Sequence, residues 1–444
     1  MINRPFSTMA KDEAGSMTIF GMFMIIACLV IGGLAMDVMN GVKTRTQLQA
    51  AADSAAHATL MARNYGKTDA EAINVGVAVG NAQLGRSGIT DTLRADDFKF
   101  GKWDSTKQEF VIDSFSDDAI LVSAQRLASR KNAVATGFLS MIGVNYFNVR
   151  SQSVFETYVP TCTREGFFAE GRVDVQSGND FTKGFCIHSN THVEMNIDNK
   201  YANNVIVSMP DETDVVIPSD KVDDNPGIEP ALRDGVYAIP ILYRIEEIIN
   251  NIDNPLSTWF TGDYITIDPL TASPEVVTLK KNDKTVDVWK SGAVHRRTCT
   301  NKNGTITFEG HNVYTGGVLI TNCKVNIGTQ AQLIDIAIAT TNTEADSVSG
   351  QADIVLGLDD DCAAGGGLQI ATMGGVSFAS KMNAYGAQIL AIGDVTFTAN
   401  ANGVEGISIV AGGEIDSTSG IEMAFCNGAG MPSNWIAEYY RMAT

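Results

Sequence analysis

The stretch MTIFGMFMIIACLVIGGLAM, residues 17–36, decides the architecture of the N-terminal part of this chain. It is twenty residues long and carries no charge. At 1.5 Å of rise per residue, a helix of this length crosses about 30 Å, the thickness of the hydrocarbon core of a bilayer. The stretch therefore predicts a membrane-spanning helix, and its larger apolar residues include Met17, Phe20, Phe23, Ile26, Val30, Leu34 and Met36.

Charged residues bound this apolar stretch on both sides, with Lys-Asp-Glu at 11–13 before it and Asp37 after it. The following segment, 47–61, is rich in good helix formers and contains neither Pro nor Gly. We therefore expect the helix to continue beyond the membrane as one rod, as far as about Arg63. The stretch is longer than the apolar core of a signal peptide and no clear cleavage site follows it, so we expect a retained anchor with residues 1–16 as a cytoplasmic tail.

Three features of this region occur together: a glycine before the apolar stretch, an aspartate at its end, and the block TRTQLQAAADSAA at 44–56. Over residues 12–159, and most strongly over 12–61, the chain resembles the TadE/TadG-like proteins of Flp (tight adherence) pilus assembly. The resemblance implies a membrane-anchored component of pilus biogenesis without catalytic residues, whose partners are other pilus-assembly membrane proteins or pilus subunits. The motif residues are Gly15, Asp37, Gln47, Leu48, Gln49, Ala51 and Asp53.

Composition narrows the class of protein further. The chain has 444 residues, enough for two or three domains with a substantial core. Its formal net charge is −19, from 32 basic and 51 acidic residues, and no basic stripe interrupts this balance. Nucleic acid is therefore not an expected partner.

The seven cysteines divide unevenly along the chain. Cys28 lies inside the apolar stretch, and the other six all follow residue 160. An even number in one soluble region favours disulfides in an oxidising compartment, with reduced core thiols as the alternative. Basic residues are balanced on the two sides of the span, so the cysteines and the resemblance decide its orientation. We expect a single-pass protein of the bacterial inner membrane, with its N-terminus in the cytoplasm and its bulk in the periplasm.

Residues 64–159 predict a soluble α+β module. Thr68 and Glu71 have the spacing of a capping box, which opens a helix that ends near Leu84. Alternating apolar and polar residues and a polar turn at 104–107 indicate strands. We expect these strands at about 98–103, 110–112, 119–125 and 147–159, and a short apolar helix over 133–142.

The region 160–444 contains repeats. Residues 368–381, 387–400 and 406–419 align without gaps, and their starts differ by 387 − 368 = 19 and 406 − 387 = 19. Each repeat has two short apolar strands around a glycine corner, which we expect to need the unusual φ angle of glycine, at Gly374, Gly393 and Gly412. This pattern predicts an all-β parallel β-solenoid (β-helix) with one coil per repeat, and the alternative is a β-sandwich with accidental periodicity.

A helical and loop insertion is expected at about 224–300. Within it, residues 239–253 place six apolar side chains at helical spacing: Ile241, Leu242, Ile245, Ile248, Ile249 and Ile252. The opposite face of this helix is acidic, which favours covering a face or end of the solenoid over binding a membrane.

Coil spacing also suggests how the cysteines pair. Residues one coil apart lie about 5 Å from each other, which suits a disulfide. The positions of Cys162 and Cys186 differ by 186 − 162 = 24, and those of Cys299 and Cys323 by 323 − 299 = 24, so we expect these two pairs. By elimination Cys362 pairs with Cys426.

Two groups of residues have the composition of a metal site. Asp359–Asp361 could hold Ca²⁺, but a solvated loop is the simpler interpretation. His188, His192 and Glu194 resemble a ligand set without a second cluster to complete it, so polar residues on the surface of a coil are favoured.

Two further runs are weaker candidates. Asp416 begins a run that echoes the metal loop of von Willebrand A-type domains, but it lies inside a repeat, in the column of Phe378 and Phe397. His295–Arg297 could meet an anionic glycan, although a charged loop is the default interpretation. We expect no catalytic residue, no metal and no cofactor.

The sequence is compatible with two functions. The first is a non-enzymatic, periplasm-facing component of Flp/Tad (type IVb) pilus assembly that acts through helix packing and protein–protein contacts. The second is a membrane-anchored glycan-binding or polysaccharide-active β-helix protein of the cell envelope. Carboxylates clustered in a cleft, or aromatic side chains stacked along one solenoid face, would favour the second.

Overall fold

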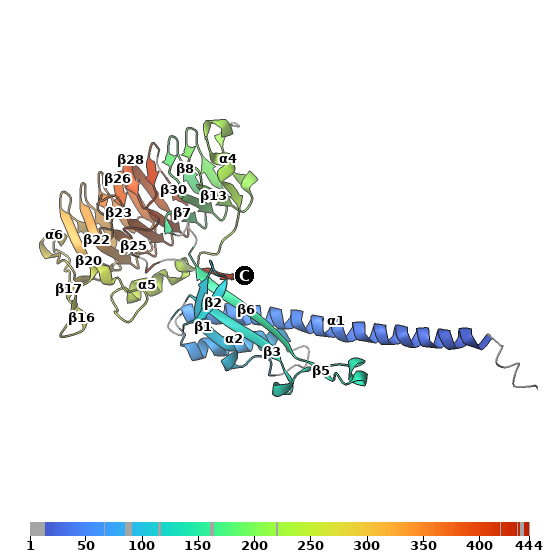
Figure 1. Cartoon of the computed structure of the whole chain (residues 1–444). Coiled ribbons are helices and arrows are strands. Elements are labelled where there is room, and N and C mark those ends of the chain that lie inside the picture. The colour runs from blue at the N-terminus through green and yellow to red at the C-terminus, as the bar shows by residue number, and fades with distance from the viewer. Residues whose placement is uncertain are drawn as a thin grey trace, which may run out of the picture. The chain divides into compact units, whose positions relative to one another are not determined.

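The computed structural model describes residues 14–65, 67–84, 91–113, 116, 118–159, 164–218, 221–417, 419–432, 434–435 and 439–443. The chain divides into two compact units (Figure 1). Unit 1 contains Met1–Tyr158 and Glu438–Thr444, and unit 2 contains Val159–Ala437. The expectation that the second domain runs to residue 444 is wrong, because the last strand pairs within unit 1.

The helix α1 (Ala14–Asn64) is unbroken over 51 residues. The predicted rod is confirmed, since the apolar stretch 17–36 continues directly into the segment that follows it. Among the helices of the described residues, α1 alone is long and apolar enough to cross a membrane. From residue 17 to residue 32 none of its residues is buried, whereas buried positions recur on one face from Gly33 onward.

Unit 1 is an α+β structure. Its second helix, α2 (Asp69–Leu84), begins with the predicted capping box: the Thr68 amide donates to Glu71 Oε2 at 3.0 Å, and the Glu71 amide donates to Thr68 Oγ1 at 3.4 Å. The second half of α1 packs on an antiparallel sheet with the strand order β2-β1-β3-β6-β32. The strands are β1 (Phe98–Asp104), β2 (Glu109–Ile112), β3 (Ala119–Arg126), β6 (Val149–Tyr158) and β32 (Tyr439–Met442).

The predicted helix over 133–142 is wrong. This part of the chain forms a two-stranded sheet of β4 (Val134–Ala135) and β5 (Tyr146–Phe147), with the short 3-10 helix η5 (Leu139–Ile142) between them. Strand pairing of Val134 and Ala135 takes up the start of the expected helix, and only Leu139–Ile142 is helical. We refer to residues 134–147 as the β4–β5 segment.

Unit 2 is built on one large, mostly parallel sheet. The strand β25 (Leu368–Thr372) pairs with β27 (Ala387–Ala391) in the register Leu368↔Ala387, which confirms the predicted offset of 387 − 368 = 19. The next pair breaks the gapless alignment, because β27 pairs with β29 (Ser408–Ala411) in the register Ile389↔Ile409, an offset of 409 − 389 = 20. This register places Ile389 beside Ile409 and Leu390 beside Val410, all of which are buried.

The glycines of the repeat corners have a different role from the one expected. Gly374, Gly393 and Gly412 do not have a positive φ angle; the positive values lie at the other turn, +55° at Gly386 and +61° at Gly406. A Cβ atom on Gly412 would lie 2.5 Å from the carbonyl oxygen of Ile392. Glycine is therefore needed at this corner because neighbouring backbone segments approach too closely for a side chain.

The order of the strands in space differs from their order in the chain. The first strand of unit 2, β7 (Gly166–Ala169), lies between β10 (Cys186–Ser189) on one side and β29 on the other. The last regular repeat therefore stacks on the first strands of the unit (Figure 1).

The expected insertion at 224–300 also contributes strands to this sheet. These are β14 (Leu232–Asp234), β17 (Val276–Thr278) and β18 (Val294–Arg297). The helical part is shorter than predicted and consists of η9 (Pro240–Arg244) and α5 (Ile245–Asn251). All six of its predicted apolar side chains are buried.

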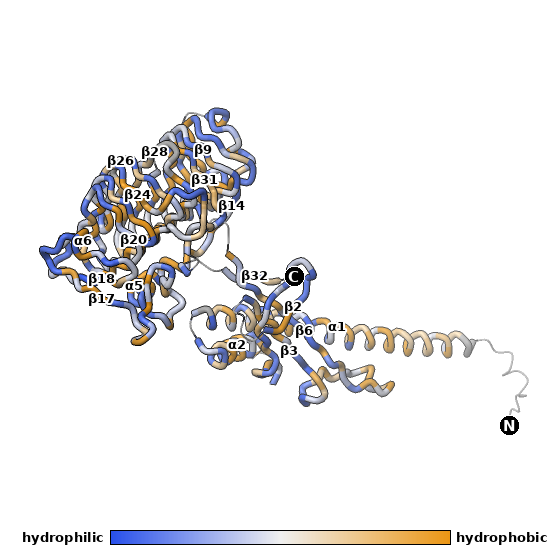
Figure 2. Tube along the Cα trace, turned by 60° about the vertical axis from the view of Figure 1, so that its left-hand side comes forward, coloured by the Kyte–Doolittle hydropathy of each residue, from blue (hydrophilic) through white to orange (hydrophobic). Residues whose placement is uncertain are grey.

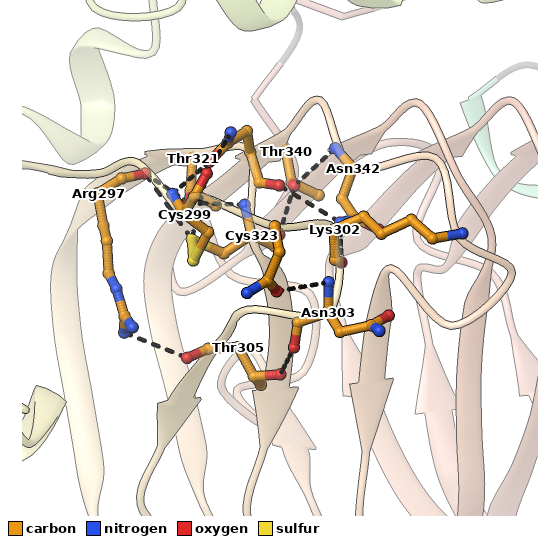
Figure 3. The surroundings of a disulfide bond; sticks show 11 residues. Arg297, Cys299, Lys302, Asn303, Thr305, Thr321, Cys323, Thr340 and Asn342 are labelled. Atoms are coloured by element: carbon orange, nitrogen blue, oxygen red, sulfur yellow. Dashed lines mark hydrogen bonds between the residues drawn. A yellow bond between two sulfur atoms is a disulfide. The ribbon is translucent and has the colours of Figure 1, made fainter. Parts of the chain in front are cut away.

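A threonine recurs at one corner of the stacked strands. The hydroxyls of Thr321, Thr340 and Thr372, which are register partners, each accept a hydrogen bond from the backbone amide two positions later, at 3.0, 3.1 and 3.0 Å. The disulfide Cys299–Cys323 lies beside this corner, with a Cα–Cα distance of 5.4 Å (Figure 3).

A second disulfide joins Cys362 to Cys426, with a Cα–Cα distance of 5.6 Å. Both of these pairs are the expected ones. Cys186 is also disulfide-bonded, while its expected partner Cys162 lies outside the described residues.

Candidate functional site

The contact between α1 and the β4–β5 segment is the first candidate functional site. Asp37 is only 7% exposed although it follows directly after the apolar stretch. Its Oδ1 atom accepts a hydrogen bond from the amide of Gly137 at 2.8 Å, and its Oδ2 atom accepts one from the amide of Leu139 at 2.7 Å. The carboxylate thereby satisfies two backbone donors at the start of η5, a strong type of hydrogen bond because the acceptor is charged.

Two glycines of α1 extend this contact in both directions. Gly33 and Gly41 lie four positions before and after Asp37, so all three positions share one helix face. A Cβ atom on Gly33 would lie 2.2 Å from Cγ of Phe138, and one on Gly41 would lie 3.3 Å from Cδ2 of Phe147. The small size of both residues lets the β4–β5 segment lie directly on the helix.

We expect Asp37→Ala to detach the β4–β5 segment from α1, because two backbone donors would lose their acceptor. Trypsin should then cleave detergent-solubilised protein faster on either side of the segment, at Lys131 and Arg150. Asp37→Asn keeps one acceptor oxygen and should give an intermediate rate. Asp96→Ala, which removes an exposed carboxylate of the same unit, is the control. Equal cleavage of Asp37→Ala and Asp96→Ala would contradict the assignment.

The Leu-Gln-x-Ala-x-Asp block lies mostly in the interior of unit 1. Leu48 and Ala51 are fully buried. Gln49 donates from Nε2 to Asp53 Oδ1 at 2.8 Å and to the carbonyl oxygen of Gln152 on β6 at 3.1 Å. Gln47 is half-buried, and Gly15 lies in the first turn of α1.

The helix α2 covers this block through two glycines. A Cβ atom on Gly80 would lie 3.1 Å from the carbonyl oxygen of Ala51, and one on Gly76 would lie 2.9 Å from that of Ala55. The buried residues of the motif therefore hold the module of their own chain together.

The apolar stretch itself remains exposed. Met17, Phe20, Phe23, Ile26, Val30, Leu34 and Met36 all face outward from α1, which is hydrophobic along this length (Figure 2). An exposed run of this size is a poor surface for water and suits a membrane anchor.

The sequence suggested that His188 lies on the surface of a coil. In unit 2 this side chain is instead fully buried. Its Nδ1 atom lies 2.8 Å from Ser208 Oγ, its Nε2 atom lies 3.0 Å from Asn190 Oδ1, and its ring lies 4.5 Å from that of Phe168. Burial lowers the pKa of His188, so the ring is a neutral core group. It does not form a ligand group with His192 and Glu194 within the described residues.

Asp416 is one of four carboxylate residues that bind the same arginine, Arg172. Arg172 donates to Glu194 at 2.8 Å, to Glu414 at 3.1 Å, to Asp416 at 3.2 Å and to Asp174 at 3.3 Å. The charges of these side chains from stacked strands are therefore partly compensated. Asp416 lies one register position away from the column of Phe378 and Phe397, both of which are core residues.

The run His295–Arg297 is part of strand β18, not a loop. His295 is fully buried and stacks on Trp289 with a ring separation of 3.9 Å. Burial lowers the pKa of His295 to about 4, so it is neutral at physiological pH. Arg296 pairs with Asp253 at 2.6 Å.

A cluster of carboxylates surrounds the Cys362–Cys426 disulfide. Glu405 Oε1 lies 2.9 Å from Cys362 Sγ and 3.7 Å from Cys426 Sγ. These three residues form the only group of metal-ligand types among the described residues, but sulfur atoms bonded to each other are not thiolate ligands. Burial raises the pKa of the Glu405 carboxyl, and the neighbouring Asp359–Asp361 run raises it further.

This cluster predicts a pH dependence. Because folding raises the pKa of Glu405 above its ordinary value of 4.5, the folded chain binds the proton more tightly than the unfolded chain. The contribution of Glu405 to the stability of unit 2 should therefore rise as the pH falls from neutral through the raised pKa, and level off below 4.5. We expect Glu405→Gln to raise the melting temperature of unit 2 at neutral pH, with the gain vanishing in acid. An equal shift of the melting temperature at every pH would contradict this prediction.

The two units define a class of protein: a long apolar N-terminal helix with a small α+β module, followed by a large, mostly parallel sheet domain. Residues 166–427 match the family model described as "Domain of unknown function (DUF7867)", which covers more than half of the chain, so the protein belongs to that family. Residues 15–62 match the model "Putative Flp pilus-assembly TadE/G-like", which confirms the resemblance at α1. Neither the curated proteins nor the solved structures gave a match.

Proposed function

We propose that this protein is a non-enzymatic component of Flp/Tad pilus assembly, anchored in the bacterial inner membrane by residues 17–36 with both units in the periplasm. The observation that carries the proposal is the TadE/G-like match over 15–62, which coincides with α1. The helix has an exposed apolar first half and a second half buried in unit 1. It therefore joins a membrane span rigidly to a folded module.

The structure of α1 limits where partners can bind. From Leu48 to Leu60, one face of the helix already packs against α2 and the sheet of the same chain. Contacts with other pilus-assembly membrane proteins or pilus subunits would therefore involve the exposed part of α1 before Leu48, or the surfaces of the two units.

We infer that unit 2 is a β-solenoid. Parallel pairing between strands one repeat apart, at offsets of 387 − 368 = 19 and 409 − 389 = 20, supports this interpretation, as does the threonine corner that recurs in register. Its disulfides suit the periplasm. Three of the polar residues considered for a glycan or metal site have structural roles, since Glu194 and Asp416 pair with Arg172 and His188 is buried.

Topology gives a direct test of this proposal. A fluorescent protein that matures only in the cytoplasm should stay dark when fused after Thr444 and be bright when fused before Met1. A bright C-terminal fusion of full length would overturn the orientation. A pull-down from solubilised membranes should then recover pilus-assembly proteins with the wild type, and recovery of none would contradict the proposed role.

A further inference from the structure

We propose that the β4–β5 segment inserts its apolar side chains into the bilayer beside α1, in the leaflet on the side of unit 1. The proposal rests on the proposed membrane anchoring of α1. The segment would give unit 1 a second attachment to the lipid, in addition to the helix itself.

The surface of the segment is apolar to an unusual degree. No charged residue occurs from 132 to 149. Met141 is 83% exposed and Ile142 is 75% exposed, and Phe138, Val144 and Tyr146 are exposed as well. Large apolar side chains gathered in this way are costly in water and mark a surface that another phase or molecule covers.

Its contact with α1 determines the depth of the segment. Phe138 packs on Gly33, which lies three positions inside the end of the apolar stretch at Met36. At 1.5 Å of rise per residue, this contact lies about 5 Å inside the end of the span. If residues 17–36 cross the bilayer, the side chain of Phe138 therefore reaches below its surface.

The acidic residue of this part of α1 is buried and hydrogen-bonded. Asp37 is the single acidic residue from 14 to 52, and it is buried under the two amide groups of the segment. Beyond it, Val38, Met39 and Val42 of α1 are still exposed. The apolar surface of the helix thus continues past Asp37 on the faces that the segment does not cover, and Figure 1 shows the part around β5 lying beside α1.

Basic residues flank this surface along the chain. Lys43 and Arg45 follow it on α1, and Lys131 and Arg150 flank the segment, all four of them exposed. No acidic residue occurs from 119 to 155. Basic side chains around an apolar patch are the arrangement that suits anionic lipid headgroups above acyl chains.

The location of the patch favours lipid over protein as the occupant. The surface begins at the depth of the span and is continuous with it along α1, so lipid that covers the exposed side chains of the helix also reaches the segment. Tyr146 combines an apolar ring with a polar end, as do the aromatic residues that collect at membrane interfaces.

Site-specific fluorescence in vesicles tests this proposal. The full chain is reconstituted in phosphatidylethanolamine–phosphatidylglycerol vesicles, with or without lipids that carry a nitroxide quencher on the acyl chain. A Met141→Cys, Cys28→Ala variant is labelled with the environment-sensitive dye NBD, while the cysteines of unit 2 are kept oxidised. The control label is at Thr106→Cys, in the exposed turn between β1 and β2, and labelling the native Cys28 reports on the anchor.

We expect the label at 141 to be blue-shifted and quenched nearly as strongly as the label at Cys28, and the label at 106 to be unaffected. Adding Ile142→Asp should reverse the quenching at 141, whereas adding Lys107→Asp to the control should change nothing. Quenching at Cys28 without quenching at 141 would overturn this proposal and leave the anchor intact. A blue shift at 141 without quenching would mean that a second copy or a partner helix covers the segment, which also overturns it. Loss of quenching at Cys28 would overturn the proposed function.

Discussion

Replacing Ala51 by proline is expected to unfold unit 1. Proline removes one backbone hydrogen bond of a helix and clashes with the preceding turn, at a cost of about 3 kcal/mol or more. Ala51 is fully buried, and the carbonyl oxygen of this residue lies against Gly80 of α2. A kink at this position would therefore also separate α2 from α1, which adds lost packing to the cost of the broken helix.

Chemical denaturation of the detergent-solubilised chain, combined with limited proteolysis, measures this effect. Unit 1 should become sensitive to protease while the disulfide-bonded unit 2 remains resistant. Ala50→Gly is the matched control, since Ala50 is exposed and glycine costs only about 1 kcal/mol in a helix. Resistance of the Ala51→Pro variant equal to that of Ala50→Gly would show that the continuous helix is not required for the fold of unit 1.

Replacing Asp97 by alanine is expected to cost about 3 kcal/mol, because it removes a buried acceptor and leaves the half-buried guanidinium of Arg130 without its counter-charge. The side chain of Asp97 is 3% exposed. It accepts hydrogen bonds from the two terminal nitrogens of Arg130 at 2.7 and 2.6 Å, and from Gln125 Nε2 at 2.7 Å. The carboxylate also accepts a hydrogen bond from the amide of Arg94 at 2.8 Å, so it joins the start of β1 to β3 and the turn that follows.

The neighbouring residue provides the control for this prediction. Asp96 is exposed, and Asp96→Ala should change the free energy of unfolding by less than about 0.5 kcal/mol. Adding Arg130→Leu to Asp97→Ala should recover part of the lost stability, because the uncompensated charge is then removed. Equal denaturation midpoints for Asp96→Ala and Asp97→Ala would contradict a structural role for this ion pair.

Local signals in the sequence predicted most elements of unit 1. The uncharged apolar stretch and the helix formers after it predicted α1, and the capping box at Thr68 predicted the start of α2. The alternation of apolar and polar residues predicted the main strands of unit 1. These signals are local because a cap, a helix face or a strand face involves residues only a few positions apart. The helix predicted over 133–142 was wrong, because the conformation of this segment depends on a hydrogen bond to Asp37, which lies far earlier in the chain.

The repeats of unit 2 were predictable for the same reason, and their exact stacking was not. The offset between positions 368 and 387 could be seen in the sequence, whereas one extra residue before the next strand was hidden by the similarity of the glycine corners. The threonine corner is a signal that could have been found in the sequence. Thr321, Thr340 and Thr372 occupy the same position in successive strands, and each accepts a hydrogen bond from the amide two positions later.

The apolar helix, its continuation into a folded module, the repeats and two of the cysteine pairs could be predicted from the sequence, because each depends on periodicity or spacing along the chain. The covered face of α1, the partners of Asp37 and the stacking of β7 on β29 could not be predicted in this way and are known from the fold. The physical reason is that these features depend on side chains and strands brought together from distant parts of the chain, where burial and hydrogen bonding, not local pattern, select the contact.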